Sequence, residues 1–159
     1  MPMDQLYEKP GHLIRRAQQI AWALFMEECA PFDITSVQYA ALFAIRENPG
    51  VDATRLSSLV AFDRSTLGSV LERLETKGLI ERAGDPKDKR LKRLHLTLQG
   101  RRLLRDIDPA VQRAQKRILA PLKPEQRRQF LSLLSQLVHL NNDLARAPLR
   151  VVDRDSLDA

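Results

Sequence analysis

Residues 52–97 read DATRLSSLVAFDRSTLGSVLERLETKGLIERAGDPKDKRLKRLHLT, and this stretch decides the fold. Asp52 and Asp63 each precede a run with helical spacing of leucines, and an aspartate in that place caps a helix. Only two residues separate the runs. Two helices joined by so short a turn must cross steeply, so the sequence predicts a helix-turn-helix. Gly78, which tolerates the left-handed conformation, is expected to end the second helix.

The periodicity then changes from that of a helix to that of a strand. Residues 79–83 and 92–96 are short strand candidates, and in the second of them Leu94 and Leu96 share one face. The connection between them, residues 84–90, contains glycine, proline, three cations and two acids. The sequence therefore predicts a two-stranded hairpin with a basic tip.

Helical periodicity continues on both sides of this module. A Thr35–Gln38 capping box precedes one helix, Thr97 can cap another, and Pro109 should kink that long helix. The expected helices cover residues 11–30, 37–47, 53–61, 63–77, 97–118 and 125–146. This order predicts a mainly α (α+β) fold, a winged helix-turn-helix with N- and C-terminal dimerisation helices.

The chain divides into four expected segments. They are an N-terminal tail with a dimerisation and pocket helix (1–34), a winged helix-turn-helix DNA-binding domain (35–97), C-terminal dimerisation helices (98–146) and a flexible tail (147–159).

Composition narrows the function classes. The 159 residues carry a net charge of +6, which favours an anionic partner such as nucleic acid. A single cysteine excludes an intramolecular disulfide framework. No apolar run approaches the ~18 residues of a membrane span, and the N-terminus lacks the basic and apolar regions of a signal peptide. We therefore expect a cytoplasmic protein that is not associated with a membrane.

The chain resembles the multiple-antibiotic-resistance-regulator (MarR) family of bacterial transcription factors over roughly residues 11–145. The resemblance implies a two-fold homodimer that binds a near-palindromic operator in double-stranded DNA at the nucleoid and that is often released by a small molecule. Lys89 departs from the arginine that the family usually has there. The segments that carry the resemblance are Thr35–Tyr39, Asp63–Thr66, Arg73–Ile80, Asp85–Arg90, Leu96–Thr97 and Gly100.

The second helix of the helix-turn-helix and the hairpin tip are the predicted DNA contacts. The start of that helix points into the major groove, and Arg64 or Arg73 can address guanine edges. Arg90 is expected in the minor groove, with Asp88 holding its guanidinium, the role this Asp-x-Arg arrangement has in the family. The alternatives are an ordinary solvated helix face and a solubilising turn. The predicted residues are Arg64, Ser65, Thr66, Ser69, Arg73, Lys77, Lys87, Asp88, Lys89 and Arg90.

The last helix carries more leucine than one small core can cover. Its apolar band is wider than a single core-facing stripe and favours a homodimer over packing within a monomeric bundle. The band comprises Leu131, Leu133, Leu134, Leu137 and Val138.

The first long helix has a second occupied face. His12 and Arg15 can hold a carboxylate while aromatic rings supply flat walls, and Gly11–Arg16 resembles the branch of the family that regulates aromatic-acid and nicotinate breakdown. We therefore expect no cofactor other than a small aromatic or N-heteroaromatic carboxylate as effector. A structural ion pair is the alternative. The predicted effector residues are His12, Arg15, Gln19, Trp22, Phe25, Tyr39 and Phe43.

Other functions have weaker support. Oxidant sensing through Cys29 needs a stabilised thiolate, which Glu27, Glu28 and a helix C-terminus all disfavour. A winged-helix adaptor that binds protein is a further alternative. An enzyme is not expected, because the sequence shows no glycine-rich phosphate loop, no candidate triad and no metal-ligand spacing among its histidines.

Overall fold

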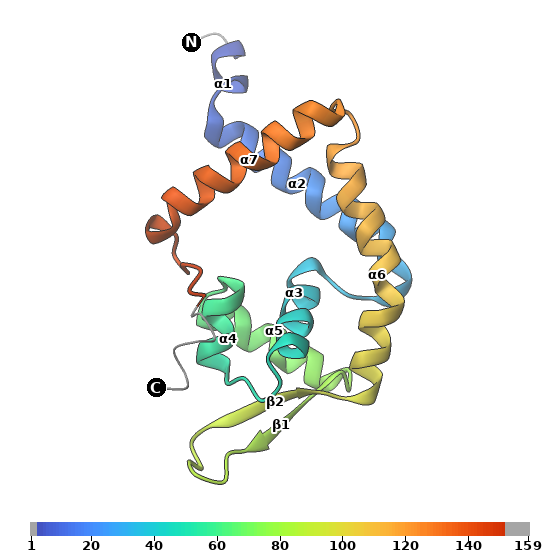
Figure 1. The fold of residues 1–159 in the computed structure, drawn as a ribbon, viewed down its shortest axis with the longest axis vertical. Coiled ribbons are helices and arrows are strands. Elements are labelled where there is room, and N and C mark those ends of the chain that lie inside the picture. Colours follow the sequence, from blue (N-terminus) through green and yellow to red (C-terminus); the bar gives the residue numbers. More distant parts are fainter. Residues whose placement is uncertain (1–2, 152–159) are drawn as a thin grey trace.

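The computed structural model describes residues 3–151. The helix-turn-helix and the hairpin form a head at one end of the molecule, and the terminal helices rise from it (Figure 1). This mostly helical architecture with one small antiparallel sheet confirms the predicted winged-helix fold. The elements are α1 (Asp4–Tyr7), α2 (Pro10–Glu28), a 3-10 turn (Ala30–Phe32), α3 (Ser36–Glu47), α4 (Ala53–Val60), α5 (Arg64–Thr76), β1 (Ile80–Gly84), β2 (Lys92–Leu96), α6 (Leu98–Leu119), α7 (Pro124–Leu140) and a second 3-10 turn (Asn142–Leu144).

Side-chain caps fix the starts of four helices. Thr35 and Gln38 form the predicted reciprocal capping box before α3. Asp52 accepts a hydrogen bond from the backbone of the first turn of α4 at 2.8 Å, and Asp63 does the same for α5 at 2.8 Å. Thr97 caps α6, with its Oγ1 3.0 Å from the Gly100 nitrogen. All four caps confirm predictions made from short sequence spacings.

The turn between α4 and α5 depends on one residue in the left-handed region. Ala61 has a φ of 54°, which costs an L-residue about 1–2 kcal/mol. The next N–H, that of Phe62, donates to the Ser57 carbonyl at 3.1 Å and closes the end of α4. Gly78, with a φ of 70°, takes the corresponding role after α5 without that cost.

The hairpin is attached to the head along both edges of β2. β1 and β2 are antiparallel with Ile80 opposite Leu96, and β1 begins one residue later than predicted. On its other edge, Leu94 exchanges backbone hydrogen bonds of 2.9 Å with Gly50 and Val51. The base of the hairpin is therefore held by the segment that leads into α4.

One continuous core joins the head to α6. It takes buried side chains from the end of α2, from α3 to β2, and from Leu104 and Ile107 of α6. Gly100 permits the closest approach, since a Cβ there would lie 2.1 Å from the Leu79 carbonyl oxygen. That same oxygen accepts the Thr97 N–H at 3.1 Å, so the start of α6 is seated directly on the end of the helix-turn-helix.

α2 and α6 pack side by side above the head. Glu28 pairs with Arg113 at 2.8 Å and with Arg117 at 2.9 Å, and these hydrogen bonds lower the pKa of the Glu28 carboxyl. α6 runs through Pro109 as one helix, and its axis curves in Figure 1.

The chain ends differ from the expectations. The last helix was predicted to reach Arg146, but α7 ends at Leu140, where the Asn141 side chain donates to the Leu137 carbonyl at 2.8 Å. The polar N-terminal tail contains the short helix α1.

Residues 145–150 form a C-terminal strap that is bound to the head. The Arg150 N–H donates to the Ser58 carbonyl of α4 at 2.9 Å. The predicted flexible tail therefore begins later than residue 147, and residues 152–159 lie outside the described part of the chain. Within residues 3–151, no helix is long and apolar enough to cross a membrane.

Candidate nucleic-acid interface

α5 presents a polar face opposite its buried one. Its core side is made by four apolar residues, and the Asp63 carboxylate caps its first turn. The backbone and hydroxyl of Thr66 donate to Asp63 at 2.8 and 3.0 Å, and these hydrogen bonds lower the pKa of the Asp63 carboxyl. The Thr66 proton is thus engaged within the helix, while the hydroxyl oxygen remains an acceptor. The exposed predicted DNA contacts on α5 are Arg64, Ser65, Thr66, Ser69 and Arg73.

Lys77 lies apart from this group. It follows the last residue of α5, and its Nζ contacts both the Asp33 carboxylate, at 3.0 Å, and the Asp33 carbonyl. Its side chain joins the end of α5 to the turn after α2. The structure therefore places Lys77 in a contact within the protomer, away from the donors at the start of α5.

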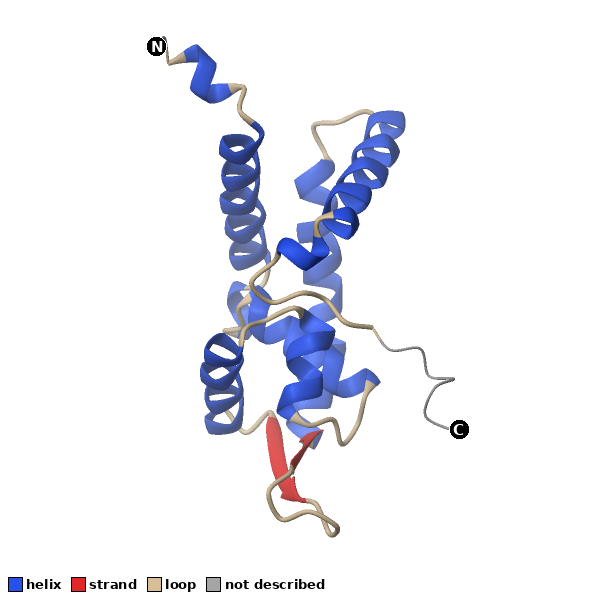
Figure 2. Ribbon diagram, turned by 90° about the vertical axis from the view of Figure 1, so that its left-hand side faces the viewer, coloured by secondary structure: helices blue, strands red, loops and turns tan. Residues whose placement is uncertain are grey.

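The hairpin tip carries the second group of cations. Lys87, Asp88, Lys89 and Arg90 are all exposed in the connection between β1 and β2. Figure 2 shows this connection at the end of the molecule, beyond the helices. A narrow exposed loop of this kind suits the minor groove, where the negative potential is concentrated.

The arginine held by an aspartate is a different one from that predicted. Asp88 accepts the backbone N–H of Arg90 at 2.9 Å and leaves the guanidinium of Arg90 unheld by that carboxylate. Instead Asp85 binds Arg93, with 2.7 Å to Nε and 2.6 Å to Nη2. The expectation that Asp88 positions the Arg90 guanidinium is thus wrong for this structure, because the turn brings Asp88 Oδ1 onto the backbone.

Asp85 organises the base of the tip. Its carboxylate also accepts the Lys87 N–H at 2.7 Å, and these hydrogen bonds, first that of Lys87 and then that of Arg93, lower the pKa of Asp85. Arg93 reaches on to the Gly50 carbonyl at 3.3 Å. Sequence reasoning did not select Asp85 or Arg93 as site residues, although the outward register of Arg93 in β2 was a usable signal.

A further ion pair joins the helix to the hairpin. Glu75 of α5 and Arg82 of β1 are 2.9 Å apart. Together with the Asp85–Arg93 pair, this contact fixes the hairpin relative to the exposed face of α5. The two groups of donors therefore belong to one rigid module.

The predicted effector residues form two groups rather than one pocket in the protomer. On the first turns of α2, Arg15 Nη2 lies 3.3 Å from His12 Nδ1, and Tyr7 lies 5.7 Å from the His12 ring between centroids. Gln19 and Trp22 continue this exposed face, with Trp22 57% exposed.

The aromatic residues of the prediction lie deeper, between α2 and α3. Phe25 is buried in the core, its ring 6.0 Å from that of Tyr39, and Tyr39 is 6.1 Å from Phe43. Arg46 stacks over Phe43 at 4.4 Å. Phe25 is thus a core residue, and only the outer rings of this cluster are available to a ligand.

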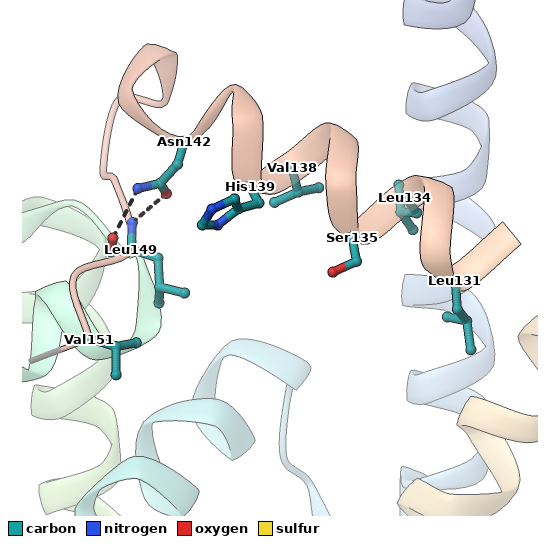
Figure 3. Close-up of a pocket in the computed structure, with 8 residues that line it drawn as sticks. All are labelled: Leu131, Leu134, Ser135, Val138, His139, Asn142, Leu149 and Val151. Carbon is teal, nitrogen blue, oxygen red and sulfur yellow. Dashed lines mark hydrogen bonds between the residues drawn. The ribbon is translucent and has the colours of Figure 1, made fainter. Parts of the chain in front are cut away.

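An apolar hollow lies instead between α7 and the C-terminal strap (Figure 3). Its volume is about 590 Å³, and the leucine side of α7 forms one of its walls. The residues around it are Leu131, Leu134, Ser135, Val138, His139, Asn142, Leu149 and Val151.

Cys29 is unsuited to oxidant sensing in this protomer. Its side chain is 1% exposed, and burial, with help from the Glu28 charge, raises the pKa of the thiol. Since the thiolate is the reactive form, both effects oppose reaction with an oxidant.

Comparisons with known proteins agree with this geometry. A family model described as MarR family matches residues 32–91. The transcriptional regulator HosA of Escherichia coli O111:H- is 30% identical over 134 residues, covering 84% of this chain and 98% of its own.

Two solved structures add a ligand context. The transcriptional repressor CouR bound to a 23-mer DNA duplex has a TM-score of 0.79 at 29% identity, covering 87% of this chain and 98% of its own. Bordetella bronchiseptica BpsR, whose DNA binding is regulated by 6-hydroxynicotinic acid, has a TM-score of 0.77 at 29% identity, covering 82% of this chain and 94% of its own.

Proposed function

Because the chain belongs to the MarR family of transcriptional regulators, we propose that it is a homodimeric repressor that leaves its operator when it binds a small aromatic acid. The observation that carries this proposal is the exposed donor face of α5 locked beside a basic hairpin. A helix with such a face reads base edges, and the flanking cations bind phosphates.

The DNA contacts divide into two kinds. Arg64, Ser65, Ser69 and Arg73 enter the major groove from α5, and the hairpin tip places Arg90 in the adjacent minor groove. The DNA-bound form of CouR, a protein of the same fold, supports this arrangement.

The dimer is proposed from the exposed leucines of α7. None of the residues of α7 is buried in the described protomer, although Leu131, Leu133 and Leu137 lie along it. Figure 2 shows α7 standing apart from α2, whose residues Leu13 and Ile20 are also about half exposed. Apolar area of this extent marks an interface, and a two-fold pairing of the terminal helices covers both surfaces.

The effector is proposed to be an aromatic or N-heteroaromatic carboxylate, with no other cofactor. Regulation of BpsR by 6-hydroxynicotinic acid supports this chemical class. Arg15 and His12 offer a cationic and hydrogen-bonding edge on α2, beside the exposed Trp22 ring. Because these groups face outward, a second protomer is needed to close a pocket around them.

The family consists of transcriptional regulators, and we assign this chain no catalytic role. Its site of action is then the bacterial nucleoid in the cytoplasm, where the operator lies. This placement follows from the proposed DNA binding.

One experiment tests the effector and the operator together. Duplexes are first selected from random-sequence DNA by binding to the protein, and affinity is then measured by fluorescence anisotropy with and without benzoates, hydroxybenzoates and nicotinates. We expect one class of acid to weaken binding by a coupling of about 1–3 kcal/mol. Arg15→Ala should retain the affinity for DNA and lose the release, and Arg16→Ala on the next position is the matched control.

Two results would contradict the proposal in different ways. Failure to enrich any duplex would remove the assignment as a DNA-binding repressor. Enrichment without calorimetric binding of any acid in the panel would retain the repressor and reject the effector class.

A further inference from the structure

The C-terminal strap is fastened at both of its ends. The Asn142 side chain makes two hydrogen bonds with the Leu149 backbone, at 2.9 and 3.0 Å (Figure 3). Arg55 Nη1 of α4 donates to the Arg150 carbonyl at 3.1 Å, in addition to the Arg150–Ser58 backbone bond. The backbone of the strap is thus fixed on the head, while its arginine side chains point from a defined base.

A hollow of about 310 Å³ opens between this strap and the start of α5. Three guanidinium groups border it, those of Arg64, Arg146 and Arg150. The acid on its border is Asp63, whose two oxygens accept hydrogen bonds from Thr66. The remaining border is formed by Ser57, Ser58, Phe62, Ala147 and Pro148.

The cations of the hollow are available to a ligand. Arg150 pairs with Asp143 at 3.0 Å, but the side chains are 60% and 80% exposed, so water weakens this pair. Ser57 and Ser58 direct their hydroxyls to the Thr54 carbonyl, at 2.7 and 3.5 Å. The hollow is therefore an open basic site whose positive groups exceed the carboxylate at its border.

We propose that the strap and the start of α5 form a second phosphate-binding site, which holds the DNA backbone at the end of α5 opposite the hairpin. This inference rests on the proposed DNA-binding function. Guanidinium groups bind phosphate oxygens in pairs, and three of them around one hollow match a doubly contacted phosphate diester.

The position along α5 is what identifies DNA as the partner. The hairpin follows the C-terminal end of α5, and the strap lies at its N-terminal end. A helix of 13 residues is about 20 Å long, compared with a major groove about 12 Å wide. Cations at both ends of such a helix can contact the two backbones that border the groove.

The test uses the full chain and a fluorescent mixed-sequence duplex, because phosphate contacts do not depend on sequence. Arg146→Gln with Arg150→Gln removes two cations of the site. Lys116→Gln with Arg128→Gln removes two exposed cations from α6 and α7 and is the matched control. Anisotropy titrations from about 50 mM to about 200 mM salt give the affinity and its salt slope for each protein.

We expect the strap variant to bind more weakly and with a salt slope smaller by about 1–2 than that of the wild type. Two lost contacts correspond to about a tenfold smaller decline in affinity over this salt range. The control should keep the wild-type slope. Equal slopes for the strap variant and the control would overturn the site, while binding by the wild type would leave the proposed function intact.

A third variant separates a positioned site from diffuse charge. Asn142→Ala unfastens the strap and leaves all its cations in place. We expect it to lower the affinity at about 100 mM salt severalfold. Unchanged binding would overturn the positioned site, and no binding of any duplex by the wild type would overturn this proposal together with the function on which it rests. Thermal unfolding of each variant confirms that it is folded.

Discussion

α5 and α7 are both leucine-rich helices, yet they differ in what covers their apolar side. α5 buries Leu67, Val70, Leu71 and Leu74 against α3, α4 and β1. α7 buries none of its residues in the described protomer and makes its main contact with the short turn that follows it. The head therefore completes its own core, whereas the α7 arm presents a surface that a second protomer is expected to cover.

The largest effect should come from charging the arm. Leu134→Glu with Leu137→Glu places four carboxylates in the proposed dimer. Because each leucine is already partly covered, we assign about 1 kcal/mol to each, or about a thousandfold in the dimer dissociation constant. Sedimentation should show folded monomers at concentrations where the wild type is dimeric.

The matched control for this variant is Gln129→Glu with Gln136→Glu on the polar side of α7. It adds the same charge and should remain dimeric. A wild type that sediments as a monomer at micromolar concentration would remove the distinction between the head and the arm.

The next effect tests the other helix. Leu74→Ala opens a cavity in the core of the head, where Leu74 is 0% exposed, and should lower the free energy of unfolding by about 3 kcal/mol. Leu140→Ala on the arm, where the residue is 80% exposed, should change it by less than about 0.5 kcal/mol. Denaturant titrations measure both values, and equal losses would contradict the contrast between the two helices.

Within α5, the exposed face can be divided by position. Arg73→Ala should reduce the preference for the selected operator over mixed-sequence DNA by about 1–3 kcal/mol, if Arg73 reads a base edge. Lys77→Ala should have a smaller effect, because Lys77 is paired with Asp33. Competition binding measures this preference, and an equal loss of affinity for both duplexes would make Arg73 a phosphate contact.

The smallest effect concerns the hairpin and pH. The lowered pKa of Asp85 means that its contacts stabilise the folded hairpin above the unfolded pKa of about 3.9 and are lost as the pH falls through the lower folded value. Protection of the Arg93 Nε–H, followed by NMR, should therefore persist from neutral pH to about pH 4 and vanish below it. Asp85→Asn should abolish this protection at every pH, and Asp88→Asn should retain it.

The features that sequence predicted well are local. The caps at Thr35, Asp52, Asp63 and Thr97 each join residues three positions apart, and all four are present. Such contacts depend on short-range backbone geometry, so they are legible without knowledge of the rest of the fold. The order of helices and strands follows from the same local periodicities.

The errors concern contacts between distant segments. Lys77 meets Asp33 across 44 positions, and Arg93 meets the Gly50 carbonyl across 43. The strap reaches α4 across more than 90 positions through Arg55 and Arg150. A helical wheel or a strand register does not contain these distances, and this is why Lys77 was assigned to DNA and residue 147 to a flexible tail.

The sequence by itself determined the winged helix-turn-helix, the basic tip and the excess of leucine in the last helix. Only the tertiary structure decided that Asp85 rather than Asp88 holds an arginine, that Phe25 belongs to the core, and that the strap completes a basic hollow beside Arg64. The reason is physical: caps and periodicity arise between neighbours in the chain, whereas ion pairs and burial arise wherever the packed fold brings side chains together.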